Sequence, residues 1–68
     1  MEEIIWGRRI RAFRKLKGFT QEEFARQIGI SVSILGEIER GNRNPSDDLL
    51  QTVVEVLNIS FDELKSIR

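Results

Sequence analysis

The stretch TQEEFARQIGISVSILGEIER, residues 20–40, decides the fold of this chain, because it reads as two short helices joined by a tight corner. Thr20 is placed to cap the first helix, and Glu23, three residues on, completes a capping box. Phe19 precedes the cap and can pack on Phe24 as a hydrophobic staple. The stretch therefore begins with a complete start signal for a helix.

The corner between the two helices is marked by Gly29, which follows the last apolar residue of the first helix, Ile28. Glycine turns the chain at positive φ without steric cost just past a helix end. Ser31 is placed to cap the second helix, and Gly41 stands where that helix is expected to end. Helix, glycine-containing turn and helix form the unit that places its second helix in the major groove of DNA. We therefore expect a recognition helix over about residues 31–40.

The length of 68 residues allows one domain, expected over residues 1–68, near the lower size at which a single core holds a fold unaided. The chain has no cysteine and no histidine, which excludes zinc fingers, disulfides and cysteine or histidine catalysis. No nucleophile, base and orienting group can be assembled from the other residues, so no enzyme, metal site or cofactor is expected. No apolar run approaches the roughly 20 residues of a membrane span, and MEEIIW, residues 1–6, lacks the features of a signal peptide. The expected compartment is cytoplasmic.

Formal net charge is zero at pH 7, but the charges are unevenly distributed along the chain. Residues 1–43 hold nine Lys or Arg against six Asp or Glu, a net charge of +3, and residues 44–68 hold two against five, a net charge of −3. Such asymmetry can turn one basic face toward phosphate, with less total attraction than a uniformly basic domain has.

A first helix is predicted from about Glu3 to Lys17, before a stop at Gly18. Acidic residues at its start and basic residues at its end suit the helix dipole. Its apolar stripe is predicted to comprise Ile5, Trp6, Ile10, Phe13 and Leu16. Its other face carries Arg8, Arg9, Arg11, Arg14, Lys15 and Lys17. Contact with a phosphate backbone, with Arg11 as the predicted ligand, is one interpretation of this basic face, and a solvated surface is the other.

The loop GNRNPS, residues 41–46, follows the central unit and holds the only proline of the chain. Arg43 and the backbone N–H groups suit a phosphate clamp, and an ordinary connector is the alternative. Ser46 is placed to cap a fourth helix, whose apolar face comprises Leu49, Leu50, Val53, Val54 and Leu57. The capping-box pattern recurs over residues 60–63, so a fifth helix is predicted from Phe61.

The predicted fold class is all-α, a compact bundle of five helices, because no stretch alternates as a strand does. The first, fourth and fifth helices are expected to build the core that holds the central pair. Four apolar residues near the chain ends are candidates either for a self-association surface or for completing the core: Ile4, Trp6, Phe61 and Ile67. A single helix-turn-helix reads few base pairs, so we expect a homodimer on two half-sites about one helical turn apart.

The second helix of the central unit is expected to present one face to a partner. Helical spacing leaves outward the residues Val32, Ser33, Gly36, Glu37 and Arg40. Ser33 can hydrogen-bond a base edge, Val32 can touch a thymine methyl group, and Glu37 can accept from a cytosine amino group. Gly36 either lets the helix approach a groove closely or is a tolerated surface glycine. Arg40, at the helix end, is better placed for phosphate.

Five short motifs follow one another in order along the chain. They are GRRIRAFR at residues 7–14, TQEEFA at 20–25, GIS at 29–31, IERG at 38–41 and NPS at 44–46. Together, at this spacing, the motifs resemble the Xre/Cro helix-turn-helix family, the lambda-repressor-like DNA-binding domains of phage and bacterial regulators. The resemblance implies a five-helix fold, dimeric binding to a palindromic operator in double-stranded DNA, and transcriptional regulation, with repression as the expected mode.

The same resemblance implies roles for individual residues. By matching position, Gln21 contacts a phosphate and braces the recognition helix, and Arg14 and Glu39 form a largely buried ion pair between the first and third helices. The base-facing positions are expected at Val32, Ser33, Gly36 and Glu37. By matching position the loop residues Asn42, Arg43 and Asn44 also contact phosphate. With Arg11 and Arg40, which are expected from their places on the basic face and at the helix end, the predicted phosphate contacts are Gln21, Arg11, Arg40, Asn42, Arg43 and Asn44. Members of the family often carry Gln, Arg, Lys, Asn or Thr at the base-facing positions, unlike this chain.

Two other interpretations stay open at this point. The fold can serve as a protein-interaction module that binds a partner through its acidic second half or its fifth helix. The chain can also be the DNA-binding domain of a longer regulator.

Overall fold

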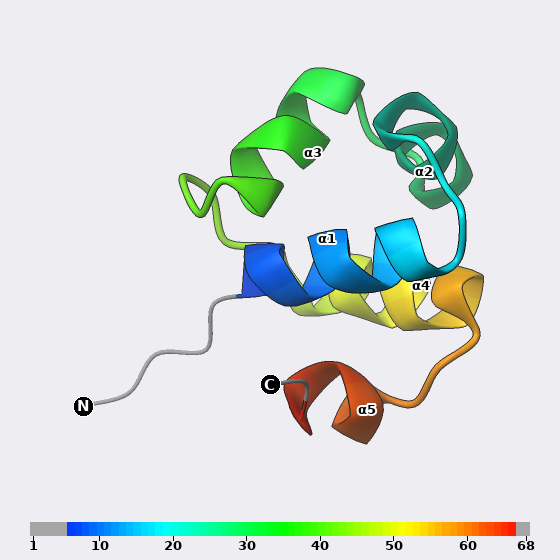
Figure 1. Cartoon of the computed structure of the whole chain (residues 1–68). Helices are drawn as coiled ribbons and strands as arrows, with labels where there is room; N and C mark the ends of the chain where they lie inside the picture. Colours follow the sequence, from blue (N-terminus) through cyan, green and yellow to red (C-terminus); the bar gives the residue numbers. More distant parts are fainter. Residues whose placement is uncertain (1–5, 67–68) are drawn as a thin grey trace.

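The computed structural model describes residues 6–66, which form five helices and no strand (Figure 1). In chain order the helices are α1 (Trp6–Leu16), α2 (Gln21–Ile28), α3 (Val32–Glu39), α4 (Asp47–Leu57) and α5 (Phe61–Ser66). The predicted all-α, five-helix fold is therefore confirmed. The predicted beginning of the first helix at Glu3, and the apolar residues Ile4, Ile5 and Ile67, lie outside the described residues. No helix within residues 6–66 is both long and apolar enough to cross a membrane.

The predicted helix starts are formed by the expected side chains. In the capping box of α2, the Thr20 hydroxyl accepts from the N–H of Glu23 at 3.1 Å, and the Glu23 carboxylate accepts from the N–H of Thr20 at 3.0 Å. The rings of Phe19 and Phe24 lie 5.5 Å apart, as a hydrophobic staple requires. The helices α3, α4 and α5 are capped in turn by Ser31, Ser46 and Ser60. Each cap satisfies a backbone N–H that a helix end leaves unpaired.

The turn after α2 is made by Gly29 in the left-handed conformation, with φ 81°. Its N–H donates to the carbonyl oxygen of Ala25 at 2.9 Å, and this hydrogen bond ends α2. The chain then turns, and α3 begins at Val32. Asn58 ends α4 in the same conformation, with φ 57°. Sequence reasoning did not single out Asn58, although asparagine is the residue that most often replaces glycine at such a position.

The core lies between all five helices. Its buried apolar side chains are Ile10, Phe24, Ala25, Ile28, Leu35, Ile38, Leu50, Val53, Val54, Leu57 and Leu64. α1 packs on α3 and α5, while α2 packs on α3 and α4. Because α2 and α3 supply five of these eleven side chains, the central pair is part of the core and is not merely held by the other three helices.

α1 corrects one sequence prediction. The helix buries Gly7, Ile10 and Arg14, whereas Leu16, predicted to lie on the apolar stripe, is 75% exposed. Each residue of a helix turns by about 100°, so Leu16 lies about 240° around the axis from Ile10. The position one turn beyond Ile10 on the buried side belongs to Arg14.

Gly7 lets α1 touch α3 backbone to backbone. A Cβ atom built at this position would lie 1.9 Å from the carbonyl oxygen of Ile38 and 3.0 Å from the carbonyl carbon of Glu39. Non-bonded heavy atoms are at their optimal separation at about 3.5 to 4.0 Å, so no side chain fits at this position without moving a helix. This contact fixes the C-terminal end of α3 against α1.

The start of α5 meets the start of α1 through aromatic rings. The ring centroids of Trp6 and Phe61 lie 5.4 Å apart, and the ammonium of Lys65 lies 5.9 Å from the centre of the Phe61 ring. Trp6 is half-buried, and Phe61 is 40% exposed. The pair therefore packs the two helices together while leaving part of Phe61 at the surface.

Candidate nucleic-acid interface

α3 turns one face to the core and the other to solvent. Leu35 and Ile38 are buried. On the opposite side Val32 is 40% exposed, Ser33 is exposed and Glu37 is partly exposed. Three of the four residues predicted to face bases therefore lie at the surface of the free protein.

The fourth predicted base-facing residue, Gly36, is buried, and this corrects the expectation of an outward position. A Cβ atom built at Gly36 would meet only the side chain of Arg40, whose Nη1 atom would lie 3.1 Å away. The cover is thus the end of a flexible, exposed side chain. Arg40 therefore lies over Gly36 on the outward side of α3.

The loop after α3 folds back along the last turn of that helix. Asn42, Arg43 and Asn44 are all exposed, as expected of phosphate ligands. The N–H of Asn42 donates to the carbonyl oxygen of Glu37 at 2.9 Å, and Nε of Arg43 donates to Oε1 of Glu37 at 2.8 Å. The ion pair between Glu37 and Arg43 was missed by sequence reasoning. The available signal was a pair of opposite charges on either side of the turn at Gly41.

A buried hydrogen-bond network joins the first three helices. Arg14 donates from Nε and Nη2 to the two carboxylate oxygens of Glu39, at 2.6 Å and 3.1 Å, and from Nη1 to the carbonyl oxygen of Phe19 at 2.9 Å. Gln21, at the start of α2, donates its side-chain N–H to Oε1 of Glu39 at 2.9 Å. Arg14 and Glu39 are 6% and 8% exposed. The ion pair that the resemblance implies is present, and Gln21 braces α3 through it.

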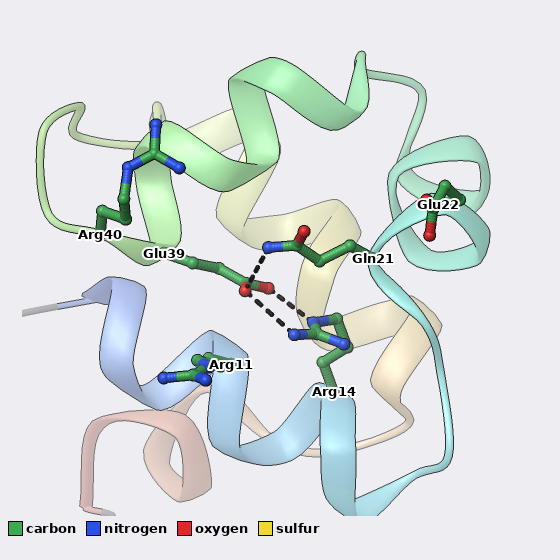
Figure 2. Close-up of a pocket in the computed structure, with 6 residues that line it drawn as sticks. All are labelled: Arg11, Arg14, Gln21, Glu22, Glu39 and Arg40. Atoms are coloured by element: carbon green, nitrogen blue, oxygen red, sulfur yellow. Dashed lines mark hydrogen bonds and ion pairs between the residues drawn. The ribbon is translucent and has the colours of Figure 1, made fainter.

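An open cleft of about 470 Å³ lies over this network (Figure 2). Its lining comprises Arg11, Arg14, Gln21, Glu22, Glu39 and Arg40. Figure 2 shows the Glu39 carboxylate joined to both Arg14 and Gln21, with Arg40 above it and Arg11 below it. Three arginines against two glutamates leave the lining with a net positive charge, which suits a phosphate oxygen.

A basic strip on α1, formed by Arg8, Arg11 and Lys15, extends from this cleft. A neighbouring cleft of about 380 Å³ is lined by Arg8, Arg11, Ala12, Lys15 and Glu39, so that Arg11 belongs to both. Arg9 does not join the strip: its guanidinium donates to the carbonyl oxygens of Leu64 and Lys65 at the end of α5. One residue of rotation, about 100°, carries Arg9 away from its basic neighbours and toward α5.

Glu23, at the start of α2, has a perturbed acidity. The backbone N–H of Thr20 donates to its carboxylate and lowers the pKa of Glu23 below its ordinary value of 4.5, with the Thr20 hydroxyl acting in the same direction. The charge therefore stays on the carboxylate where the helix dipole favours it. Within residues 6–66, no cluster of acidic side chains is gathered in a way that would hold a metal ion.

These features define the class of the domain. Two short helices meet at a glycine in the left-handed conformation, and the second helix packs on the protein with one face while the other face is exposed to solvent. The chain belongs to the helix-turn-helix family, whose model matches residues 10–64. The resemblance to regulators of the Xre/Cro type is confirmed by this match and by the relatives described next.

Two relatives from Bacillus subtilis (strain 168) differ in how much of their own length this chain covers. The uncharacterized HTH-type transcriptional regulator YazB is 73% identical over 64 residues, which cover 94% of this chain and 93% of YazB. The HTH-type transcriptional regulator SinR is 41% identical over 59 residues, which cover 85% of this chain and 53% of SinR. The chain thus spans almost all of one relative and about half of the other.

Solved structures share the fold. The crystal structure of SinR, a master regulator for biofilm formation, in complex with DNA superposes with a TM-score of 0.79 and 40% identity, covering 87% of this chain and 95% of that chain. The restriction-modification controller protein C.AhdI from Aeromonas hydrophila gives a TM-score of 0.82 and 36% identity, covering 90% and 92%. The whole five-helix arrangement is therefore common to these proteins.

Proposed function

We propose that this domain binds double-stranded DNA in a sequence-dependent manner and regulates transcription by occupying an operator, most simply as a repressor. In this proposal α3 lies in the major groove with Val32, Ser33 and Glu37 toward the base edges. The observation that carries the proposal is the asymmetry of α3, which packs on α1 and α2 on one side and exposes Val32 and Ser33 on the other.

The surroundings of α3 support contact with a phosphate backbone. The exposed arginines Arg11 and Arg40 line the cleft beside its C-terminal end, and the exposed loop residues Asn42 and Asn44 follow it. Gln21 begins α2, where helix N–H groups point outward and favour an anion. The relative SinR has been solved in complex with DNA. Together these features supply the sequence-independent attraction that accompanies base reading.

The proposal includes a homodimer. One recognition helix covers too few base pairs for useful selectivity, and two copies related by a two-fold axis read a palindrome whose half-sites lie about one helical turn apart.

Selection from a randomised duplex library at two salt concentrations tests the proposal, with the oligomeric state measured in parallel. We expect enrichment of a palindrome with half-sites about 10 base pairs apart, centre to centre. Ser33→Ala is the matched test variant. It is expected to change the enriched sequence, and its unchanged unfolding transition serves as the control for folding. Weak binding that has no sequence preference and vanishes steeply with salt would contradict the proposal.

A second candidate function is favoured by the exposed ring of Phe61 on α5. Because this ring packs beside Trp6 and still leaves 40% of the residue at the surface, α5 offers an apolar contact to a partner protein. Capture of one defined protein that Phe61→Ala abolishes, combined with no retention on DNA at low salt, would favour this function over the first.

A further inference from the structure

We propose that Glu37 and Arg43 act as one reading unit, in which Glu37 holds the guanidinium of Arg43 and Arg43 reads a guanine in the major groove. The inference rests on the proposed DNA-binding function and deepens it. It changes the role expected of both residues: Glu37 positions another side chain and does not read a cytosine, and Arg43 reads a base and does not clamp a phosphate.

The geometry places both side chains on the open face of α3. Glu37 lies four residues after Ser33, one turn along the same side of the helix. Nε of Arg43 donates to Oε1 of Glu37 at 2.8 Å, and the two side chains are 52% and 39% exposed. The backbone hydrogen bond from Asn42 to Glu37 holds the loop against this turn. The guanidinium of Arg43 therefore lies beside the face of α3 that the proposed function turns toward DNA.

The pairing uses one edge of the guanidinium and leaves the other for a ligand. Within residues 6–66, the Arg43 side chain forms its hydrogen bond through Nε to Glu37. The Nη1 and Nη2 groups remain as a planar fork, which matches the O6 and N7 acceptors of guanine. A guanidinium already held by a carboxylate loses less freedom on binding than a mobile one, and the pairing removes the repulsion between Glu37 and phosphate.

The rest of the α3 surface offers no competing side chain for a bidentate contact with guanine. Val32 and Ser33 are too short for a bidentate contact, and Gly36 is covered. Arg40, the other arginine at this end, lies over Gly36 and lines the cleft of the Arg14–Glu39 network, where a phosphate contact is expected. Arg43 is thus the arginine whose guanidinium is held by Glu37 beside the outward face of α3.

The test measures base preference at every operator position for the wild type, Glu37→Ala, Arg43→Ala, Arg43→Lys and the double alanine variant. We expect both alanine variants to lose the preference for guanine at the same position, each by on the order of 10-fold. The double variant should lose no more than Arg43→Ala alone. Arg43→Lys should keep much of the overall affinity and lose this preference, because lysine keeps the charge without the fork.

Controls separate this inference from folding and from DNA binding itself. Both side chains lie at the surface, so circular dichroism and thermal unfolding are expected to match the wild type. Glu55→Ala, which removes an exposed carboxylate on α4, should leave every preference unchanged. A wild type that selects no sequence would overturn the proposed function together with this inference.

Three outcomes would overturn the inference while DNA binding stands. Preferences lost at two different positions, with additive effects, would show that Glu37 and Arg43 read separately. An equal loss of affinity on all sequences for Arg43→Ala, with a smaller salt dependence, would assign Arg43 to phosphate. Tighter binding of Glu37→Ala to every sequence would show that Glu37 restrains Arg43 from DNA.

Discussion

Two helical glycines of this domain have opposite surroundings, and replacement by alanine should separate them. At Gly7 a methyl group meets the backbone of Ile38, so Gly7→Ala should lower the free energy of unfolding by about 1 to 3 kcal/mol or more. At Gly36 it meets only the mobile end of Arg40, so Gly36→Ala should be neutral or stabilising by up to about 1 kcal/mol. Urea unfolding of both variants measures the difference. Equal effects would contradict the close contact at Gly7.

The buried ion pair should depend on both of its members. Glu39→Ala leaves the guanidinium of Arg14 buried without its partner, and we expect a loss of about 3 to 5 kcal/mol in the free energy of unfolding. Replacing both residues, as Arg14→Met with Glu39→Leu, should cost clearly less, because no charge is then stranded. Denaturant titration of the wild type and the two variants gives the comparison. A double variant less stable than Glu39→Ala would contradict this account.

Single residues also mark the limit of what the sequence could predict. The Arg14–Glu39 pair was expected from resemblance alone, since nothing local links residues 25 positions apart. The contact of Gly7 with Ile38 depends on how α1 and α3 cross, and the pairing of Glu37 with Arg43 depends on the path of a loop. No local pattern encodes the first arrangement, and the opposite charges on either side of Gly41 indicate the second without fixing it.

Among the elements, α2 should respond to acid through its capping box. Glu23 has a lower pKa in the folded chain than its ordinary value of 4.5, because it accepts from the N–H of Thr20. The folded state thus binds fewer protons at this site, so the stabilisation is complete at neutral pH and is lost as the pH falls from 4.5 through the lowered pKa. Urea unfolding at a series of pH values should show the advantage of the wild type over Glu23→Gln shrinking with acid. A constant difference would contradict it.

Helix starts were predictable because their signals lie within a few residues of sequence. The serine and threonine caps, the staple of Phe19 on Phe24 and the turn at Gly29 all formed as expected. Burial along each helix was less predictable, because it depends on neighbours that are distant in sequence. Leu16 points away from all of them, and Gly36 is covered by a side chain from the end of its own helix.

For the molecule as a whole, the uneven charge distribution predicts which variants change the salt dependence of DNA binding. α3 and α5 lie on opposite sides of α1 (Figure 1). Basic residues near α3 are therefore close to the face that the proposed function turns toward DNA, and basic residues on α5 are far from it. Arg11→Ala and Arg40→Ala should each reduce the slope of log affinity against log salt by about 1, without changing base preference. Lys65→Ala on α5 should leave the slope unchanged. A slope that stays at the wild-type value for both arginine variants would exclude them as phosphate contacts.

The residues that hold α3 in place are not the ones that it shows to the outside. The position of α3 depends on the contact of the Ile38 backbone with Gly7 and on the hydrogen bonds of the Glu39 carboxylate, whereas Val32, Ser33 and Glu37 face outward. Point substitutions on the outward side can therefore accumulate without weakening the contacts that hold α3 in place. In evolutionary terms, a lineage can therefore acquire new targets by successive substitutions on the outward face of α3, while the contacts that hold the fold stay the same and every intermediate still folds.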